Sequence, residues 1–190
     1  NDFIPDAILV FHVLLQTASL TSLFYSYASG KIVGFEIIGA AVSTGINSGT
    51  SAIVVAHELV HRKNKFFKGL GKFLLFSAGN IYFYVEHLRV HHKWVGTDKD
   101  PATAKRGESL YRFFIRSMSG QIKGAWAVEQ ERLRKENKNV LNNYVLQNLI
   151  LQIVLLIVLF KLIGLMAVAL YMHQVLVANF LLESTNYIEH

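Results

Sequence analysis

The sequence predicts an all-α, polytopic membrane protein, a helical bundle of about four spanning helices plus a re-entrant or interfacial segment. Three observations support this fold class. Hydrophobic residues make up 52% of the 190 residues and charged residues only 17%, whereas an average soluble domain is about a quarter charged. The apolar residues form four long runs that carry almost no charge. The basic residues, in contrast, are concentrated between the second and third runs, a distribution typical of the loops of membrane proteins.

The four apolar runs cover residues 6–29, 32–56, 144–160 and 162–182. Each approaches or exceeds the roughly 20 residues that a helix needs to cross a hydrocarbon core about 30 Å thick. Gly30 and Lys31 separate the first two runs, and Lys161 separates the last two. We therefore predict two hairpins of spanning helices with tight turns at these residues.

The stretch from Arg62 to Lys138 holds 17 of the 19 lysine and arginine residues and seven of the 13 acidic residues, a net charge of about +10. Because positively charged loops stay in the cytoplasm, we predict that residues 62–138 are mainly cytoplasmic and that both hairpin turns face the other side. Aromatic residues do not alternate with the basic ones, as they do in many nucleic-acid-binding surfaces. We therefore expect membrane lipid, and no nucleic acid, as a partner.

Five of the eight histidines form two clusters. His57 and His61 continue the second apolar run without a helix breaker, and their spacing places both imidazoles on one helix face, about 6 Å apart along the axis. Such a pair can bind one metal ion. His87 and His91 repeat the spacing, and in an α-helix His92 points about 100° further around the axis. The second cluster could therefore reach a second metal ion.

Residues 66–85, which separate the two clusters, are apolar enough to suggest a fifth span. A single crossing would place the clusters on opposite faces, about 30 Å apart. Lys68, Lys72 and three glycines also argue against a span. We therefore predict a re-entrant or interfacial segment buried against the other helices. The last two runs then return residues 183–190 to the face of the clusters, so that His190 can join them.

The chain has no cysteine, so a metal site must use imidazole and carboxylate ligands, which suit zinc, iron or copper. One alternative is a zinc peptidase with Glu58 as the general base, and a single histidine pair can also arise by chance. Six well-placed histidines are too many for one tetrahedral ion, and the count favours two metals and oxygen activation by iron. For His12 and His173, which lie within apolar runs, we expect packing or hydrogen-bonding roles.

Several segments together resemble the membrane alkane monooxygenases (alkane hydroxylases). Residues 57–63 resemble the first histidine box of this family, and residues 86–92 and 95–102 resemble its second box and the Asp-Pro-Ala stretch that follows. Residues 125–133 resemble the amphipathic stretch further on, and residues 182–190 the Asn-Tyr-x-Glu-His segment. The resemblance covers residues 47–190 in the family's order, although each box alone is shared with fatty-acid desaturases and hydroxylases. Val90 stands where the family usually has glycine, and we expect it to tighten helix packing at the metal.

The resemblance implies terminal hydroxylation of medium-chain n-alkanes to primary alcohols. It implies a non-haem centre of two Fe ions, O2 as co-substrate, and electrons from rubredoxin and its reductase. It also implies a multi-pass protein of the bacterial inner membrane, with the active site towards the cytoplasm. The expected metal ligands are His57, His61, His87, His91, His92 and His190. Glu58, Glu86 and Glu189 each lie beside a ligand and are expected to orient imidazoles, although one of them could be a direct ligand.

Gly45, Gly49 and Thr50 lie among small and hydroxyl-bearing residues of the second run. They could line a substrate channel that binds an alkane through apolar area, about 0.8 kcal/mol per buried CH2 group. Close helix–helix packing through the GxxxG spacing is the alternative.

The sequence begins at Asn1 without a methionine and stops directly after a helix-period run, at His190. We therefore expect a single integral-membrane hydroxylase domain, residues 1–190, truncated at both ends. The resemblance then places the family's last histidine box beyond His190, so the fragment alone should be inactive.

Three alternatives remain open: a membrane fatty-acid desaturase or hydroxylase of the same histidine-box class, an intramembrane zinc peptidase, and a metal-handling protein without enzymatic activity. The basic residues near the clusters also allow two interpretations. They could set the membrane topology and interact with lipid headgroups, or they could dock an acidic electron carrier. These residues are Arg62, Lys63, Lys65, Arg89, Lys93, Lys105 and Arg106.

Overall fold

The structure is a computed structural model that describes residues 3–189. Within this range the regular elements are helices and there is no strand, which confirms the all-α class. The chain divides into two compact units: the first comprises Asn1–Gly79 and Ile153–Leu181, and the second Asn80–Gln152 and Leu182–His190. That the chain is one integral-membrane domain, with residues 62–138 mainly cytoplasmic, stays a prediction.

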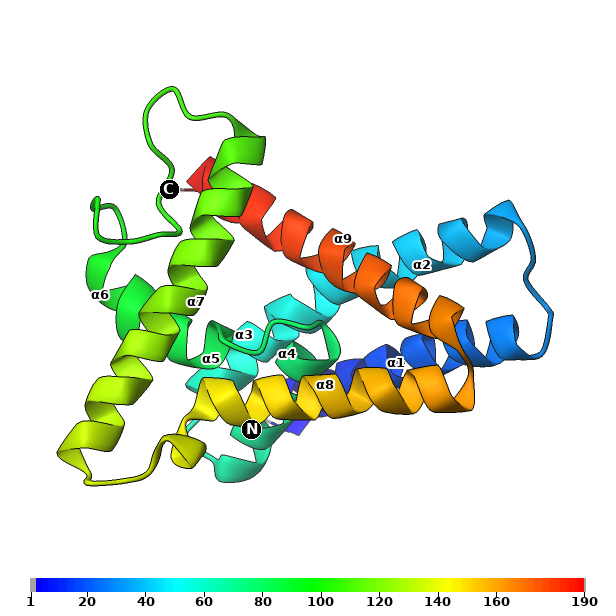
Figure 1. Cartoon of the computed structure of the whole chain (residues 1–190), viewed down its shortest axis with the longest axis horizontal. Helices are drawn as coiled ribbons and strands as arrows, with labels where there is room; N and C mark the ends of the chain where they lie inside the picture. Colours follow the sequence, from blue (N-terminus) through cyan, green and yellow to red (C-terminus); the bar gives the residue numbers. More distant parts are fainter. Residues whose placement is uncertain (1–2, 190) are drawn as a thin grey trace. The chain divides into compact units, whose positions relative to one another are not determined.

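Figure 1 shows the helical elements, coloured along the chain. In chain order they are α1 (Phe3–Ala28), α2 (Phe35–Asn47), the π-helical turn η1 (Ser48–Ala52), α3 (Ile53–His61), α4 (Lys65–Ser77), α5 (Phe83–Glu86), the π-helical turn η2 (His87–His91), α6 (His92–Trp94), α7 (Leu110–Lys135), the 3₁₀ turn η3 (Val140–Asn142), α8 (Tyr144–Leu162) and α9 (Leu165–Glu189).

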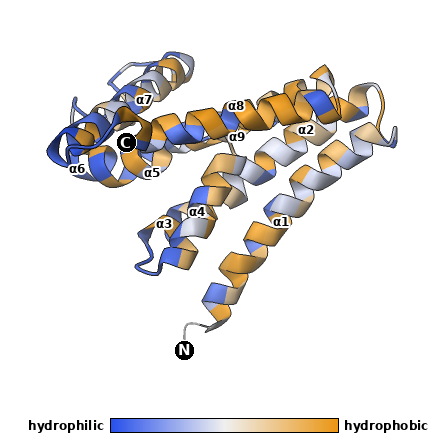
Figure 2. Ribbon diagram, turned by 60° about the horizontal axis from the view of Figure 1, so that its bottom comes forward, coloured by the Kyte–Doolittle hydropathy of each residue, from blue (hydrophilic) through white to orange (hydrophobic). Residues whose placement is uncertain are grey.

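Four helical stretches are long and apolar enough to cross a membrane, as the four apolar runs predicted, and hydrophobic residues dominate α8 in Figure 2. They are Ile4–Ala28, Phe35–His61, Tyr144–Leu162 and Leu165–Glu189. The second stretch combines α2, η1 and α3 into one rod. The second and fourth helices extend beyond the predicted ends at residues 56 and 182, because no glycine or proline follows there to stop them.

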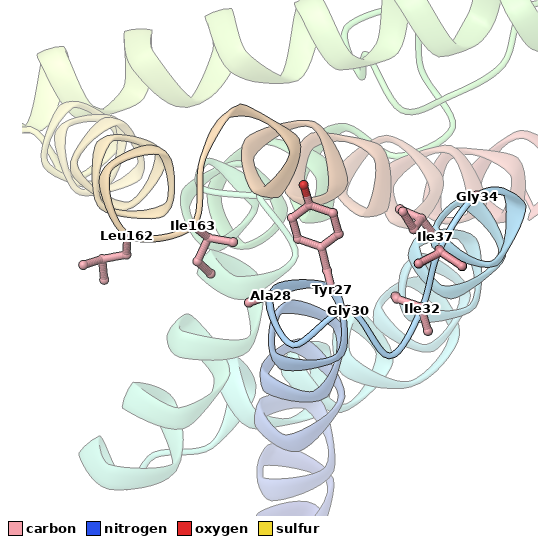
Figure 3. Close-up of a pocket in the computed structure, with 9 residues that line it drawn as sticks. Tyr27, Ala28, Gly30, Ile32, Gly34, Ile37, Leu162 and Ile163 are labelled. Atoms are coloured by element: carbon pink, nitrogen blue, oxygen red, sulfur yellow. The ribbon is translucent and has the colours of Figure 1, made fainter.

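Both hairpin turns lie at the same end of the first unit, as predicted (Figure 1). Gly30 and Gly34 adopt left-handed backbone angles (φ 68° and 55°) between α1 and α2, which glycine adopts without steric cost. Gly164 (φ 113°) makes the turn between α8 and α9. Lys161, where the sequence placed this turn, lies instead in the last turn of α8, since the first helix breaker is Gly164. Residues of both turns line an open pocket of about 500 Å³ (Figure 3).

Helix α4 does not form a fifth span. Its 13 residues are too few to cross a hydrocarbon core. It runs back along α3, so closely that a Cβ atom added to Gly71 would lie 2.9 Å from Cβ of Leu59. The hydroxyl of Ser77, its last residue, lies 3.3 Å from Nε2 of Gln16, which is in the middle of α1. These contacts agree with the predicted burial of this segment against the other helices.

A buried polar network connects four helical elements of the first unit. Gln16 of α1 donates to the Ser48 hydroxyl of η1 (2.8 Å), and Ser48 donates to Oε1 of Gln174 in α9 (2.9 Å). Gln174 in turn donates to the carbonyl of Ser77 in α4 (3.1 Å). Gln16, Ser48 and Gln174 are at most 1% exposed. Because polar groups in hydrocarbon must find partners within the protein, this network fixes the mutual positions of the four elements.

The second unit packs the histidine-bearing segment against α7. Its core contains Tyr82, Val85, Ala125 and Val145. The connection from residue 95 to residue 109 folds onto α7 at Gly120, where an added Cβ atom would lie only 2.7 Å from Cβ of Pro101. This close packing holds in place the loop that follows the second histidine cluster.

Candidate metal centre

In the first unit, α3 presents His57 and His61 on one face, as their spacing predicted. The two ring centroids are 4.9 Å apart, and a ligand nitrogen of one lies within 4.8 Å of a ligand nitrogen of the other. Both residues are exposed and lie in the last turns of the rod. The pair could therefore supply two ligands to one metal ion.

In the second unit, the closest histidine pair is His87 and His92. Their Nε2 atoms are 2.8 Å apart and their ring centroids 4.4 Å apart, whereas the centroids of His87 and His91 are 5.4 Å apart. The sequence prediction, which assumed an α-helix, directed His92 away from His87. The backbone instead forms the π-helical turn η2, whose i to i+5 hydrogen bonds bring residues five apart onto one face.

The short distance between these nitrogens is compatible with metal binding. Two imidazole nitrogens that bind one ion at about 2.1 Å and at right angles to each other lie roughly 3 Å apart. His87 is buried, with 7% of its surface exposed, and its ring stacks on that of Phe83 at a centroid distance of 4.7 Å. The surrounding packing thus holds the ring in a position to bind.

Asp100 contacts His91 and was given no role by the sequence analysis. Its Oδ2 atom lies 3.0 Å from Nδ1 of His91 and accepts a hydrogen bond from the Thr103 hydroxyl (2.7 Å), while Oδ1 accepts from the backbone N–H of Ala102 (3.1 Å). Burial raises the pKa of Asp100, but the hydrogen bonds from His91 and Thr103 outweigh this effect and leave the pKa below its ordinary value. A carboxylate on Nδ1 orients a ligating histidine so that Nε2 binds the metal.

Glu86 and Glu183 bring two buried carboxyl groups into the same unit. They are 2% and 1% exposed, and Glu183 accepts a hydrogen bond from Nε2 of Gln121 (2.7 Å). Burial, followed by the charges of Asp100 and Glu183, raises the pKa of Glu86 to about 8. Oε1 of Glu86 and Oε2 of Glu183 have no hydrogen-bond partner among the described residues. Buried polar atoms without partners are rare in folded proteins, and a cation bound at either atom would satisfy it.

Asp100 could have been found from the sequence, whereas Glu183 could not. Asp100 follows the second cluster by eight residues, and a ligating histidine commonly has a carboxylate partner, so a search for that partner could have found it. Glu183 lies in the apolar helix α9, and nothing in its local sequence connects it with Gln121, 62 residues earlier.

The other two glutamates that were predicted to orient imidazoles, Glu58 and Glu189, are exposed. Oε1 of Glu58 lies 3.1 Å from Nε of Arg62, whose Nη2 is 3.5 Å from a carboxylate oxygen of Asp6. Glu58 therefore takes part in an exposed ion pair, and Glu189 is exposed at the end of α9. Their roles in orienting imidazoles stay predictions. The predicted ligand His190 lies outside the described residues.

Nδ1 of His12 lies 2.8 Å from the hydroxyl of Ser51, in agreement with the hydrogen-bonding role expected for His12. Nε2 of His173, within α9, is buried and has no partner among residues 3–189. Neither residue belongs to the two histidine pairs described above.

Two of the three residues of the predicted channel, Gly45 and Gly49, lie where the rod meets α9, and Thr50 is exposed. Added Cβ atoms would lie 2.6 Å from Cβ of Val177 at Gly45, and 2.9 Å from the carbonyl oxygen of Ala178 at Gly49. The hydroxyl of Thr50 donates to the carbonyl of Ile46 (2.8 Å). These contacts are those of close helix packing, the alternative that the sequence left open, and the channel stays a prediction.

Val90 packs against α7 in the second unit. An added Cβ atom at Gly124 would lie 3.6 Å from both Cγ atoms of Val90, and Val90 is 8% exposed. The valine side chain thus lies over a glycine of the neighbouring helix, one residue from the ligand candidate His91.

Comparison with known proteins identifies the family. Residues 35–190 match the fatty acid desaturase family. The chain belongs to the fatty acid desaturase family. The resemblance to membrane alkane monooxygenases is also confirmed, since the chain is similar to several proteins of that name.

This family member is 39% identical to alkane 1-monooxygenase 1 of Alcanivorax borkumensis over 82% of the chain and 39% of that protein. It is 38% identical to alkane 1-monooxygenase of Ectopseudomonas oleovorans over 82% of the chain and 39% of that protein. It is 33% identical to alkane 1-monooxygenase 1 of Pseudomonas aeruginosa over 95% of the chain and 50% of that protein. The chain thus spans half the length of these relatives or less.

Proposed function

We propose that the protein to which this chain belongs hydroxylates medium-chain n-alkanes at the terminal carbon and releases primary alcohols. Its co-substrate is O2, and its electron donor is rubredoxin, reduced by rubredoxin reductase. The observation that carries the proposal is the convergence of the His87 and His92 Nε2 atoms, 2.8 Å apart, in a relative of alkane 1-monooxygenases.

The cofactor in this proposal is a pair of non-haem Fe ions. The ligands are the six histidines predicted from the sequence, of which His190 lies outside the described residues. The donor set fits iron, because imidazole and carboxylate ligands without thiolate suit this metal. Two buried carboxyl oxygens of Glu86 and Glu183 also have no hydrogen-bond partner within residues 3–189. When bound, the irons would supply the activation of O2. Asp100 orients His91, while Glu86 and Glu183 place two buried carboxyl groups in the second unit.

The substrate has no polar group to hydrogen-bond, so its affinity must come from apolar area, about 0.8 kcal/mol for each buried CH2 group. We propose that it enters from the lipid phase between membrane helices. Gly45, Gly49 and Thr50 are the proposed channel residues, although the contacts of both glycines with α9 support packing instead.

The proposed location is the bacterial inner membrane, with the active site towards the cytoplasm. The net charge of about +10 on residues 62–138 supports this orientation by the positive-inside rule. A subset of these basic residues would dock the acidic electron carrier. Charge reversal at Arg89 and Lys93 should then slow electron transfer from rubredoxin, and unchanged electron transfer would remove docking from the proposal.

Metal analysis and turnover of the full-length protein test the proposal. We expect two irons per chain, and oxygen uptake that depends on octane, rubredoxin and its reductase and yields 1-octanol. His87→Gln should lose iron and activity, whereas the matched control His173→Gln, which alters a histidine outside both pairs, should keep them. Two zinc ions and no alcohol product would contradict the proposal.

A membrane fatty-acid desaturase or hydroxylase is the second candidate, because the family match carries that description. Incubation with octane and with a fatty acyl substrate separates the two, since only the second candidate gives an unsaturated or hydroxylated acyl chain. A zinc peptidase would instead lose activity on Glu58→Ala and would not consume oxygen.

A further inference from the structure

The lysine-bearing half of α4 lies at the level where the spanning helices leave the hydrocarbon. The rod begins at Phe35, and about 20 residues cross a hydrocarbon core, so the rod reaches the membrane edge near Ala56. Gly71 of α4 packs against the rod at this level, with an added Cβ atom 3.1 Å from the carbonyl oxygen of Ala56 and 2.9 Å from Cβ of Leu59. The C-terminal part of α4 continues inward, to Ser77.

The surface of α4 combines positive charge with aromatic rings. Lys65, Lys68 and Lys72 are spaced i, i+3 and i+7, which places them along one side of the helix. Lys65 is exposed and the other two are half-buried. Phe66 and Phe73, on the adjoining side, are 63% and 44% exposed. Figure 2 shows this mixture of hydrophilic and hydrophobic residues on α4.

Acidic side chains are absent from this segment. Residues 62–77 contain no aspartate or glutamate. The neighbouring Arg62, in contrast, is paired with Glu58 (3.1 Å) and lies 3.5 Å from Asp6. Residues 62–77 thus contribute positive charge and no negative charge of their own, while Arg62 pairs with acidic residues of α1 and α3.

We propose that the lysine side of α4 (Lys65, Lys68 and Lys72) binds the headgroup of an anionic phospholipid at the rim of the first unit. Long lysine side chains bury their methylene groups and extend the ammonium towards headgroups, and exposed phenylalanines at the same level suit acyl chains. A protein partner fits this surface less well, because the charged stripe adjoins a ring surface that faces lipid. The site is independent of the proposed hydroxylase activity.

The test compares wild-type and variant forms of the full-length protein in nanodiscs that contain phosphatidylcholine and phosphatidylglycerol in equal amounts. Native mass spectrometry after release from the nanodisc reports which lipids stay bound. The wild-type protein should retain phosphatidylglycerol in preference. The triple variant Lys65→Gln, Lys68→Gln and Lys72→Gln should lose this preference about tenfold or more, because each lysine near an anionic surface contributes roughly fivefold.

The matched control removes three lysines of the second unit by the substitutions Lys105→Gln, Lys123→Gln and Lys135→Gln, and should keep the preference. An unchanged preference in the α4 variant, or an equal loss in the control, would overturn the proposal. Thermal unfolding in pure phosphatidylcholine shows whether the glutamine variant folds. If it does not, the variant Lys65→Arg, Lys68→Arg and Lys72→Arg is used to test the proposal. It keeps the charge and should keep the preference, and its loss would also overturn the proposal.

Discussion

At the scale of single residues, the contact between Asp100 and His91 orients one ring of the second histidine cluster. Asp100→Asn replaces the carboxylate by an amide that no longer attracts the protonated Nδ1 with a full charge. We expect iron affinity to fall roughly 10- to 100-fold, the usual effect of losing such a partner. Iron titration of the full-length protein against a competing chelator measures this change.

The matched control for this prediction is Asp98→Asn, because Asp98 is exposed and only two residues away. It removes the same charge from the loop and should leave iron affinity unchanged. Equal affinities of Asp100→Asn and wild-type protein would show that the contact does not support the metal site.

The sequence predicted the first histidine pair well and the second only in part. His57 and His61 lie in a regular α-helix, so their spacing alone determines that they share a face. The direction of His92 depends on a backbone that changes to π-helical hydrogen bonding at His87, and no local residue pattern indicates that change. Glu183 was missed because its partner, Gln121, is distant in the sequence.

At the scale of helices, charge-free runs predicted the spans because membrane insertion depends mainly on length and composition. The path of α4 was less predictable. It is set by contacts such as that of Ser77 with Gln16, 61 residues apart, which a local pattern does not contain. The helix ends differed from the predicted ends for another reason. The apolar runs were ended at polar residues, but the helices continue through these residues.

The packing of the rod against α9 predicts that replacing Gly45 by alanine lowers the stability of the protein. Gly45→Ala places a methyl group 2.6 Å from Cβ of Val177, and such overpacking costs about 1–3 kcal/mol of unfolding free energy. Gly39→Ala, in the same helix, meets no atom within 4 Å and should be neutral or slightly stabilising. Thermal unfolding in detergent compares the two. A Gly45→Ala protein as stable as Gly39→Ala would favour open space at this position, as in the predicted channel.

The ion pair between Glu108, in the loop before α7, and Arg116 predicts how the stability of the fold depends on pH. The side chain of Arg116 donates to Glu108 at 2.7 Å and 2.8 Å, and this hydrogen bonding lowers the pKa of Glu108 from 4.5 to about 2. A carboxyl group with a lowered pKa stabilises the folded state above its ordinary pKa, and the contribution disappears as the pH falls from about 4.5 towards 2.

We therefore expect the stability difference between wild-type protein and Glu108→Gln to be constant from pH 7 to about 5 and to shrink at lower pH. Thermal unfolding across this range measures it. For Asp98→Asn, the matched control in the same loop, the difference from wild type should stay small throughout. A difference between wild type and Glu108→Gln that does not change with pH would contradict the assigned ion pair.

At the scale of the whole molecule, the two histidine pairs belong to different compact units, residues 57 and 61 to the first and residues 87 and 92 to the second. Two-metal chemistry requires that both pairs contribute to one centre, because adjacent metal ions in such sites are only a few ångströms apart. If so, the loss of either pair should remove the contribution that metal binding makes to folding stability.

A double-mutant cycle on the full-length protein tests this coupling. The variants are His57→Gln with His61→Gln, His87→Gln with His92→Gln, and all four substitutions together. In a shared centre either pair is needed to hold the metals, so each double variant should lose most of the iron-dependent gain in thermal stability. The quadruple variant should lose little more, since residues of one network are not additive. Losses that add up would indicate two independent sites. His12→Gln with His173→Gln, which changes as many histidines outside both pairs, should keep the iron-dependent gain.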